Sequence, residues 1–116
     1  MNVTNALVIS DLNLSQKRTN LIANNLANYE TPGFKASRLS FEGALASAMN
    51  RGPSAVLAVQ GTIVKSQTSL RADGNNVSLT GQMTALARAQ LSYQMAVSAY
   101  NHHVTQMKIV TEGKAL

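Results

Sequence analysis

The last third of the chain carries one regular row of large apolar residues, which recur at alternating steps of four and three over four heptads. Gln90 is its only polar member. The row, which we call the heptad row, consists of Leu79, Met83, Leu86, Gln90, Tyr93, Val97, Tyr100, Val104 and Met107. A repeat of about 3.5 residues is typical of helices that wrap around one another as a coiled coil. One helix cannot bury such a row against itself, so the pattern predicts a long C-terminal helix with a helical partner.

A weaker apolar pattern near the N-terminus predicts a first helix over about residues 3–28. Its members begin at heptad spacing and then drift around the helix. They are Leu7, Leu14, Leu21, Ile22 and Leu26. Asparagine occurs seven times in the first 28 residues, and asparagine is a weak helix former. We therefore expect this helix to form where packing supports it and to fray in the free subunit.

The first helix has a sharply specified end. Asn28 is a candidate for closing it in a left-handed conformation, and the proline that follows Thr31 pushes that residue to extended geometry. Pro32-Gly33 suits the two central positions of a type II turn. We expect this turn to set the direction in which the chain leaves the helix, so that Phe34 anchors on a neighbouring subunit.

The chain between the two helices predicts only short elements. They are a helix over 41–51, a break at 51–54, strands at 55–60 and 62–67, a turn at Asp73-Gly74-Asn75-Asn76, and an N-cap at Ser78 or Thr80. The predicted fold is mainly α, with two long terminal helices that form a coiled-coil hairpin and a small irregular or β middle segment. The corresponding segments are 1–34, 35–77 and 78–116.

Charge is scarce and scattered. Charged residues make up 13% of the chain, against roughly 25% in ordinary domains. From position 79 to position 112 the charged residues are Arg88, Lys108 and Glu112. A solvent-exposed helix usually carries more charged residues than this, so we expect neighbouring helices around this one. The net charge of +5 forms no stripe, and without aromatic platforms beside it we expect no nucleic-acid binding.

Other sequence features narrow the class of protein. Cysteine is absent, which excludes a disulfide framework. The N-terminus lacks the pattern of a secretory signal, and no apolar run is long enough to predict a membrane span. The segment 61–66 (GTIVKS) lacks the glycine that a phosphate-binding loop needs before its lysine, and His102 and His103 are adjacent rather than four residues apart, as a helical metal pair requires. We predict no catalytic, cofactor-binding or metal-binding residues, and hence no enzyme.

Two segments are specific when they are taken together. The first is Ala23–Ala36 (ANNLANYETPGFKA), and the second is Asp73–Val77 (DGNNV), which leads directly into the C-terminal helix. They resemble the signatures of the bacterial flagellar axial proteins, the family of rod, hook and hook-associated subunits, and within it the small subunits of the proximal rod. The chain departs from this pattern at 78–82, where acidic residues are usual. The residues that carry the resemblance are Asn24, Asn25, Asn28, Thr31, Pro32, Gly33, Phe34, Asp73, Gly74, Asn75 and Asn76.

The resemblance implies a structural subunit of the proximal rod of the flagellar basal body, a mainly α protein that assembles helically. Such subunits link the export gate and the hook-basal-body adaptor to the rest of the rod, transmit torque, and reach the periplasmic rod through the flagellar type III gate without a cleaved signal peptide. The implied partners are copies of itself, other rod subunits, the adaptor protein and the export gate, with no direct membrane span. The candidate assembly interface consists of Leu7, Leu14, Leu21, Ile22, Leu26, Leu79, Met83, Leu86, Tyr93, Val97, Tyr100, Val104 and Met107.

Two alternatives remain open from the sequence. A rod or needle subunit of a virulence-type injectisome would also be a helical hairpin without a signal peptide, although the TPGFK turn argues against it. A helical cytoplasmic adaptor or type III export chaperone is the other alternative, and it predicts a stably folded dimer in isolation.

Overall fold

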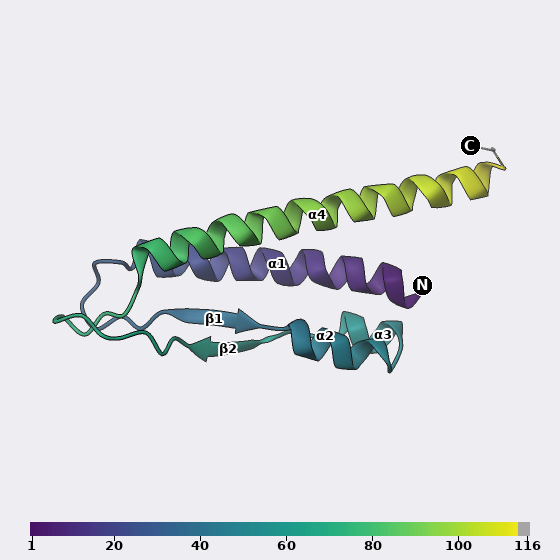
Figure 1. The fold of residues 1–116 in the computed structure, drawn as a ribbon. Helices are drawn as coiled ribbons and strands as arrows, with labels where there is room; N and C mark the ends of the chain where they lie inside the picture. The colour runs from purple at the N-terminus through teal and green to yellow at the C-terminus, as the bar shows by residue number, and fades with distance from the viewer. Residues whose placement is uncertain (114–116) are drawn as a thin grey trace.

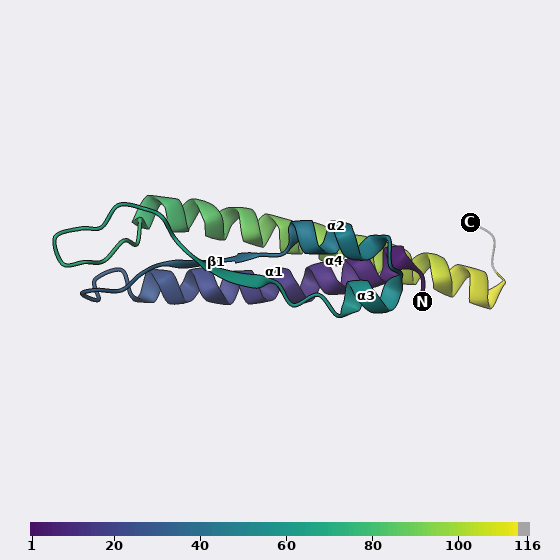
Figure 2. The ribbon, with the colours of Figure 1, turned by 90° about the horizontal axis from the view of Figure 1, so that it is seen from below.

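Two long antiparallel helices, α1 (Val3–Ala27) and α4 (Leu79–Glu112), run along an elongated molecule of 64 × 28 × 14 Å. This computed structural model describes residues 1–113, so the last three residues of the predicted C-terminal segment lie outside it. The middle of the chain packs on the side of α1 away from α4 (Figures 1 and 2). Its elements are β1 (Ser37–Ser40), α2 (Glu42–Met49), α3 (Pro53–Leu57) and β2 (Thr62–Lys65). The predicted fold class is confirmed, with long terminal helices packed on each other and a small strand-containing middle.

The end of α1 differs from the prediction in one respect. Asn28 has a φ of −102°, so its predicted left-handed conformation is wrong. Its amide instead continues the helical hydrogen bonds, reaching the carbonyl oxygen of Asn24 at 3.2 Å. The reversal is left to Gly33, whose φ of +75° carries no Cβ penalty. The Phe34 amide then donates to the Thr31 carbonyl oxygen at 3.2 Å, which closes the predicted turn.

The main apolar core lies between α1 and the middle segment. Its buried members are Ala6, Leu14, Leu39, Phe41, Leu45, Ala48 and Val56. Leu7 and Leu21 pack against the edge of the same cluster. A role of these helix leucines in an assembly interface stays a prediction, but within the chain they contact its own core, and Leu14 exposes only 4% of its surface. The reason is volume, because the middle segment offers large apolar partners, whereas α4 offers α1 mainly alanine.

The middle segment contains a two-stranded antiparallel sheet. The strand predicted at 62–67 is observed as β2, and it pairs with β1 in a register that runs from Ser37 opposite Lys65 to Ser40 opposite Thr62. Sequence patterning does not predict β1, because three of its four residues are polar and its pairing partner lies far along the chain.

Helical structure in the middle segment is partly as predicted. The helix expected over 41–51 is observed as α2. The strand expected at 55–60 is wrong, because Pro53 opens the short helix α3 there, preceded by Gly52 at a φ of +104°. Proline favours the first helical position, where its fixed φ suits the helix and no amide donor is needed.

Ser78 caps the start of α4: its Oγ accepts a hydrogen bond from the Gly81 amide at 3.1 Å, as predicted for an N-cap. Its contact with α1 uses small side chains: Ala89 and Ala96 expose 4% and 6% of their surface. With 34 residues against 25, α4 is longer than α1 by about 14 Å at a rise of ~1.5 Å per residue. It therefore extends beyond the start of α1 (Figure 1).

Candidate assembly surface and the asparagine junction

The heptad row lies to one side of the line along which α4 contacts α1. Leu86, Tyr93 and Val97 are half-buried along the edge of that contact. The exposed members of the row are Leu79, Met83, Gln90, Tyr100, Val104 and Met107. Met83 and Met107 expose 58% and 52% of their surface. Alanines form the buried centre of the contact with α1, because small residues allow the two helices to approach closely. The chain thus leaves most of the row uncovered.

Helix α4 exposes further large apolar side chains outside the row. Leu91, Met95 and Val110 are all more than half exposed. The exposed apolar side chains of the row, on a helix with so few charges, indicate a protein–protein contact. The heptad row is therefore the candidate assembly surface, and its contact with other subunits stays a prediction.

The two signature segments meet where α1 ends and α4 begins. The Gly33 amide donates to the Asp73 carbonyl oxygen at 2.8 Å, and the Asn76 amide donates to the Phe34 carbonyl oxygen at 3.1 Å. Both glycine turns are therefore joined by backbone hydrogen bonds, although they lie far apart in the sequence. The two halves of the family resemblance form one structural unit.

Asn75 is the centre of this unit and is fully buried. Its Nδ2 donates to the carbonyl oxygens of Asn28, Tyr29 and Thr31 at 2.8, 3.1 and 2.7 Å. Its Oδ1 accepts a hydrogen bond from the Val77 amide at 2.7 Å. One side chain thus satisfies carbonyl groups left open after the last turn of α1 and holds the segment before α4 against them.

Two further buried asparagines extend the unit. The Oδ1 of Asn76 accepts the Ala36 amide at 2.7 Å. The side chain of Asn25 pairs with the Ser37 backbone in both directions, at 3.1 and 2.7 Å, and also donates to Gln82 Oε1 at 3.0 Å. We call these three residues the asparagine junction: Asn25, Asn75 and Asn76. The junction joins α1, the start of β1 and the first turn of α4.

Arg71 holds the same region from outside, and sequence reasoning misses it. Its guanidinium donates to the Val77 carbonyl oxygen at 2.6 Å and also to the Tyr29 carbonyl oxygen. It stacks over the Tyr29 ring with its central carbon 4.6 Å from the ring centroid. A single arginine in a loop carries no local pattern, so only the three-dimensional contact identifies it.

The remaining signature residues act locally. The Asn28 side chain donates to the Asn24 carbonyl oxygen at 2.8 Å, and the Thr31 hydroxyl donates to the Asn28 Oδ1 at 3.1 Å. Pro32 is exposed and Phe34 is half-buried. The contact of the Phe34 ring with a neighbouring subunit therefore stays a prediction.

An ion pair attaches α2 to α1. Arg18 Nη1 and Nη2 lie 2.5 and 3.0 Å from the two carboxylate oxygens of Glu42, and Nη2 also donates to the Leu39 carbonyl oxygen at 2.7 Å. These hydrogen bonds from Arg18 lower the pKa of Glu42 to about 2. Asp11 behaves in the opposite way, because burial disfavours its charged form and raises its pKa.

The described residues offer no arrangement for metal chemistry. Within residues 1–113, no group of three or more His, Cys, Asp or Glu side chains comes together. No helix in the same range is long and apolar enough to cross a membrane. His102 is exposed, and His103 Nε2 is buried without a hydrogen-bond partner among these residues.

Comparison with known proteins gives one consistent result. The family model described as flagella basal body rod protein matches residues 9–35. The chain is similar to the flagellar basal body rod protein FlgB of Bacillus subtilis, with 29% identity over 97% of this chain and 92% of that protein. It is also similar to the FlgB proteins of Escherichia coli, with 30% identity over 88% of each chain, and of Borrelia hermsii, with 28% identity over 85% of this chain and 88% of that protein. The chain belongs to the FlgB family of flagellar basal body rod proteins.

Proposed function

We propose that this rod subunit lies in the proximal rod, links the export gate and the hook-basal-body adaptor to the other rod subunits, and transmits torque between them. The observation that carries the proposal is the uncovered heptad row on a helix that is otherwise poor in charge. A monomer gains nothing from exposing such a row, whereas a helical assembly buries it in every copy.

Burial of the row supports assembly on energetic grounds. Burying a large apolar side chain completely contributes about 1.5–3 kcal/mol. Met83 and Met107 still expose about half of their surface, so each would contribute ~1 kcal/mol at a helix–helix contact. Five of the six exposed members of the row are apolar, and together they reach several kcal/mol before the cost of association is subtracted. Repetition along a rod then stabilises each subunit through more than one neighbour.

We assign separate roles to the three segments of the chain. Residues 1–34 and the segment that begins at 78 would form the axial layer around a central channel, and residues 35–77 would brace it from outside. The support is the layered arrangement, in which the middle segment covers one face of α1 and α4 covers another (Figure 2). This leaves the heptad row free for other subunits.

Export through the flagellar type III gate, without a cleaved signal peptide, is part of the same proposal. Its support is the membership of the chain in a rod family and the small size of its core. A chain with few buried side chains and no cysteine unfolds at little cost in free energy, which suits passage as an unfolded polypeptide.

Deletion of the gene, followed by purification of basal bodies, tests the proposal. We expect rings and an export gate without a rod, and restoration by the tagged wild-type chain, which should be found in the basal-body fraction. Complete rods in the deletion strain would refute the proposal. An injectisome subunit, a cytoplasmic adaptor or an export chaperone predicts instead that the tagged chain lies outside flagellar basal bodies.

A further inference from the structure

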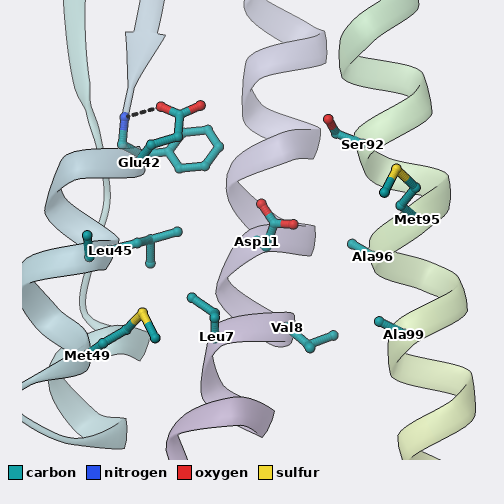
Figure 3. A pocket seen from close by; sticks show the side chains of 12 residues that line it. Leu7, Val8, Asp11, Glu42, Leu45, Met49, Ser92, Met95, Ala96 and Ala99 are labelled. Carbon is teal, nitrogen blue, oxygen red and sulfur yellow. Dashed lines mark hydrogen bonds between the residues drawn. The ribbon is translucent and has the colours of Figure 1, made fainter.

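A groove runs along α1 between α2 and α4 and encloses about 480 Å³ (Figure 3). Its floor is formed by α1, one wall by α2 and the other by α4. The lining residues that matter for the argument are Val8, Asp11, Leu45, Met49, Met95 and Ala99. The groove is thus mostly apolar on both walls and carries the Asp11 carboxylate on its floor.

Asp11 is the acidic group in this groove that makes no ion pair within the part of the chain that the structure describes. Glu42 also lines the groove, but it is paired with Arg18 at 2.5 Å. Within residues 1–113, Asp11 accepts one hydrogen bond, from the Ser15 hydroxyl at 3.4 Å. Burial is the largest influence on the pKa of Asp11 and raises it, whereas the nearby charge of Arg18 opposes this rise only in part. An apolar segment that carries one cation would complement this groove.

The far end of α4 has this chemistry. The Asn5 side chain contacts Met107 Sδ at 4.0 Å near the start of α1, so the residues after Met107 extend past that helix (Figure 1). Val104, Met107 and Lys108 follow the i, i+3, i+4 spacing of one helix face. Lys108 is the only cation between positions 89 and 112, and it makes no ion pair within the described residues.

We propose that the end of α4 of one copy docks into this groove on the next copy, with Val104 and Met107 against its apolar walls and Lys108 beside Asp11. The occupant is a second copy because the chain itself supplies a helix end with exposed apolar side chains and with Lys108, which makes no ion pair within the described residues, as helix-in-groove contacts require. Each copy carries a net charge of +5, so association needs such a local pairing of opposite charges.

The contact would be heterologous, because the helix end and the groove are different surfaces of the same chain. A heterologous contact that does not close into a ring propagates as a helical filament. The inference rests on the proposed rod function and deepens it, since it names the two surfaces through which successive copies meet.

Single cysteines test the contact, because the natural chain has none. Thr111 is exposed and lies on the same face of α4 as Lys108, and Ala46 is exposed in the groove wall. Cells that express Thr111→Cys and Ala46→Cys on two differently tagged full-length copies should yield a mixed disulfide in basal bodies after mild oxidation. Gln106→Cys, on the opposite side of α4, and Ala44→Cys, on another side of α2, are matched controls that should lose the crosslink.

A charge swap makes the test independent of any one folding defect. Lys108→Asp in the copy that donates the helix end should abolish the crosslink, and Asp11→Lys in the accepting copy should restore it. Three outcomes would each overturn the docking and leave the rod function standing. They are equal crosslinking by the control pairs, no crosslink in basal bodies that contain the chain, and a crosslink from Thr111→Cys to another rod protein. Absence of the wild-type chain from basal bodies would overturn the rod function as well.

Discussion

Replacement of Asn75 by alanine tests whether the asparagine junction holds the two signature turns together. The substitution removes the Nδ2 donor to three carbonyl oxygens and the Oδ1 acceptor of the Val77 amide. Val77 exposes only 2% of its surface, so its amide would be left unpaired in a site with little access to water.

The expected loss follows from these contacts. The two amide protons of Asn75 are shared among three carbonyl groups and count as about two hydrogen bonds, each worth ~1 kcal/mol net. The lost bond to the Val77 amide adds ~1–3 kcal/mol, because a buried donor is left unsatisfied. The total of ~3–5 kcal/mol is a large share of the ~5–15 kcal/mol that stabilises a typical domain.

Hydrogen exchange provides the assay, with the Gly33 and Asn76 amides as reporters because each bonds across the two turns without using the Asn75 side chain. We expect both amides to exchange at least ~100-fold faster in Asn75→Ala, since ~1.4 kcal/mol corresponds to a factor of ten. The control is Asn20→Ala, an exposed site on α1 whose side chain bonds Gln16 at 3.1 Å, and it should change stability by less than ~0.5 kcal/mol. Unchanged exchange of both reporters in Asn75→Ala would show that the turns are held by their backbone bonds alone.

Three further substitutions test other parts of the argument. Val97→Asp, in the heptad row, should abolish incorporation into basal bodies but not export, because an uncompensated buried carboxylate costs several kcal/mol unless it is protonated. The control, Arg88→Ala, lies off the row and should incorporate normally. Normal swimming of cells with Val97→Asp would contradict an interface at the heptad row. Gly33→Val should block rod completion, because a valine at a φ of +75° carries ~1–3 kcal/mol of backbone strain, even though a Cβ there would meet nothing within 4 Å. Pro32→Ala should have only a mild effect. Wild-type motility of the valine variant would show that the turn is a passive connector. Glu42 has its pKa lowered from 4.5 to about 2, so its stabilising contribution is present above its unfolded pKa and is lost as pH falls through that interval. The stability difference between wild type and Glu42→Gln should therefore vanish as circular dichroism is followed down to acid pH, and a difference that does not change with pH would refute the role of the ion pair.

The long helices and the glycine turns could be predicted because their signals are local. The heptad row persists over four heptads, so an error at any one position does not obscure it. Gly33 and Gly74 have positive φ, as the turn chemistry of their neighbours indicates. In contrast, β1 has a single large apolar residue, Leu39, and forms only because β2 lies beside it.

The faces of the two helices could not be predicted from the same patterns. Leu7, Leu14 and Leu21 predict a buried face of α1, but their spacing does not say whether the partner is α4, the middle segment or another subunit. The actual contact with α4 uses Ala89 and Ala96, whose small side chains barely register in a search for large apolar residues. Packing volume, rather than periodicity, decides which face meets which partner.

The shape of this contact explains why the junction is polar. Alanine side chains bury little apolar surface, so the α1–α4 contact alone gives weak preference for one position of α4 over a neighbouring one. Hydrogen bonds are directional, and a buried polar group without one is costly. The fully buried Asn75 reaches the carbonyl groups that follow α1 only when the segment before α4 lies in one position. The asparagine junction therefore sets the position from which α4 starts, and Gln82, bonded to Asn25 at 3.0 Å, sets the rotation of its first turn. Since the heptad row is fixed to that helix, the same hydrogen bonds decide the direction in which the chain presents this apolar surface.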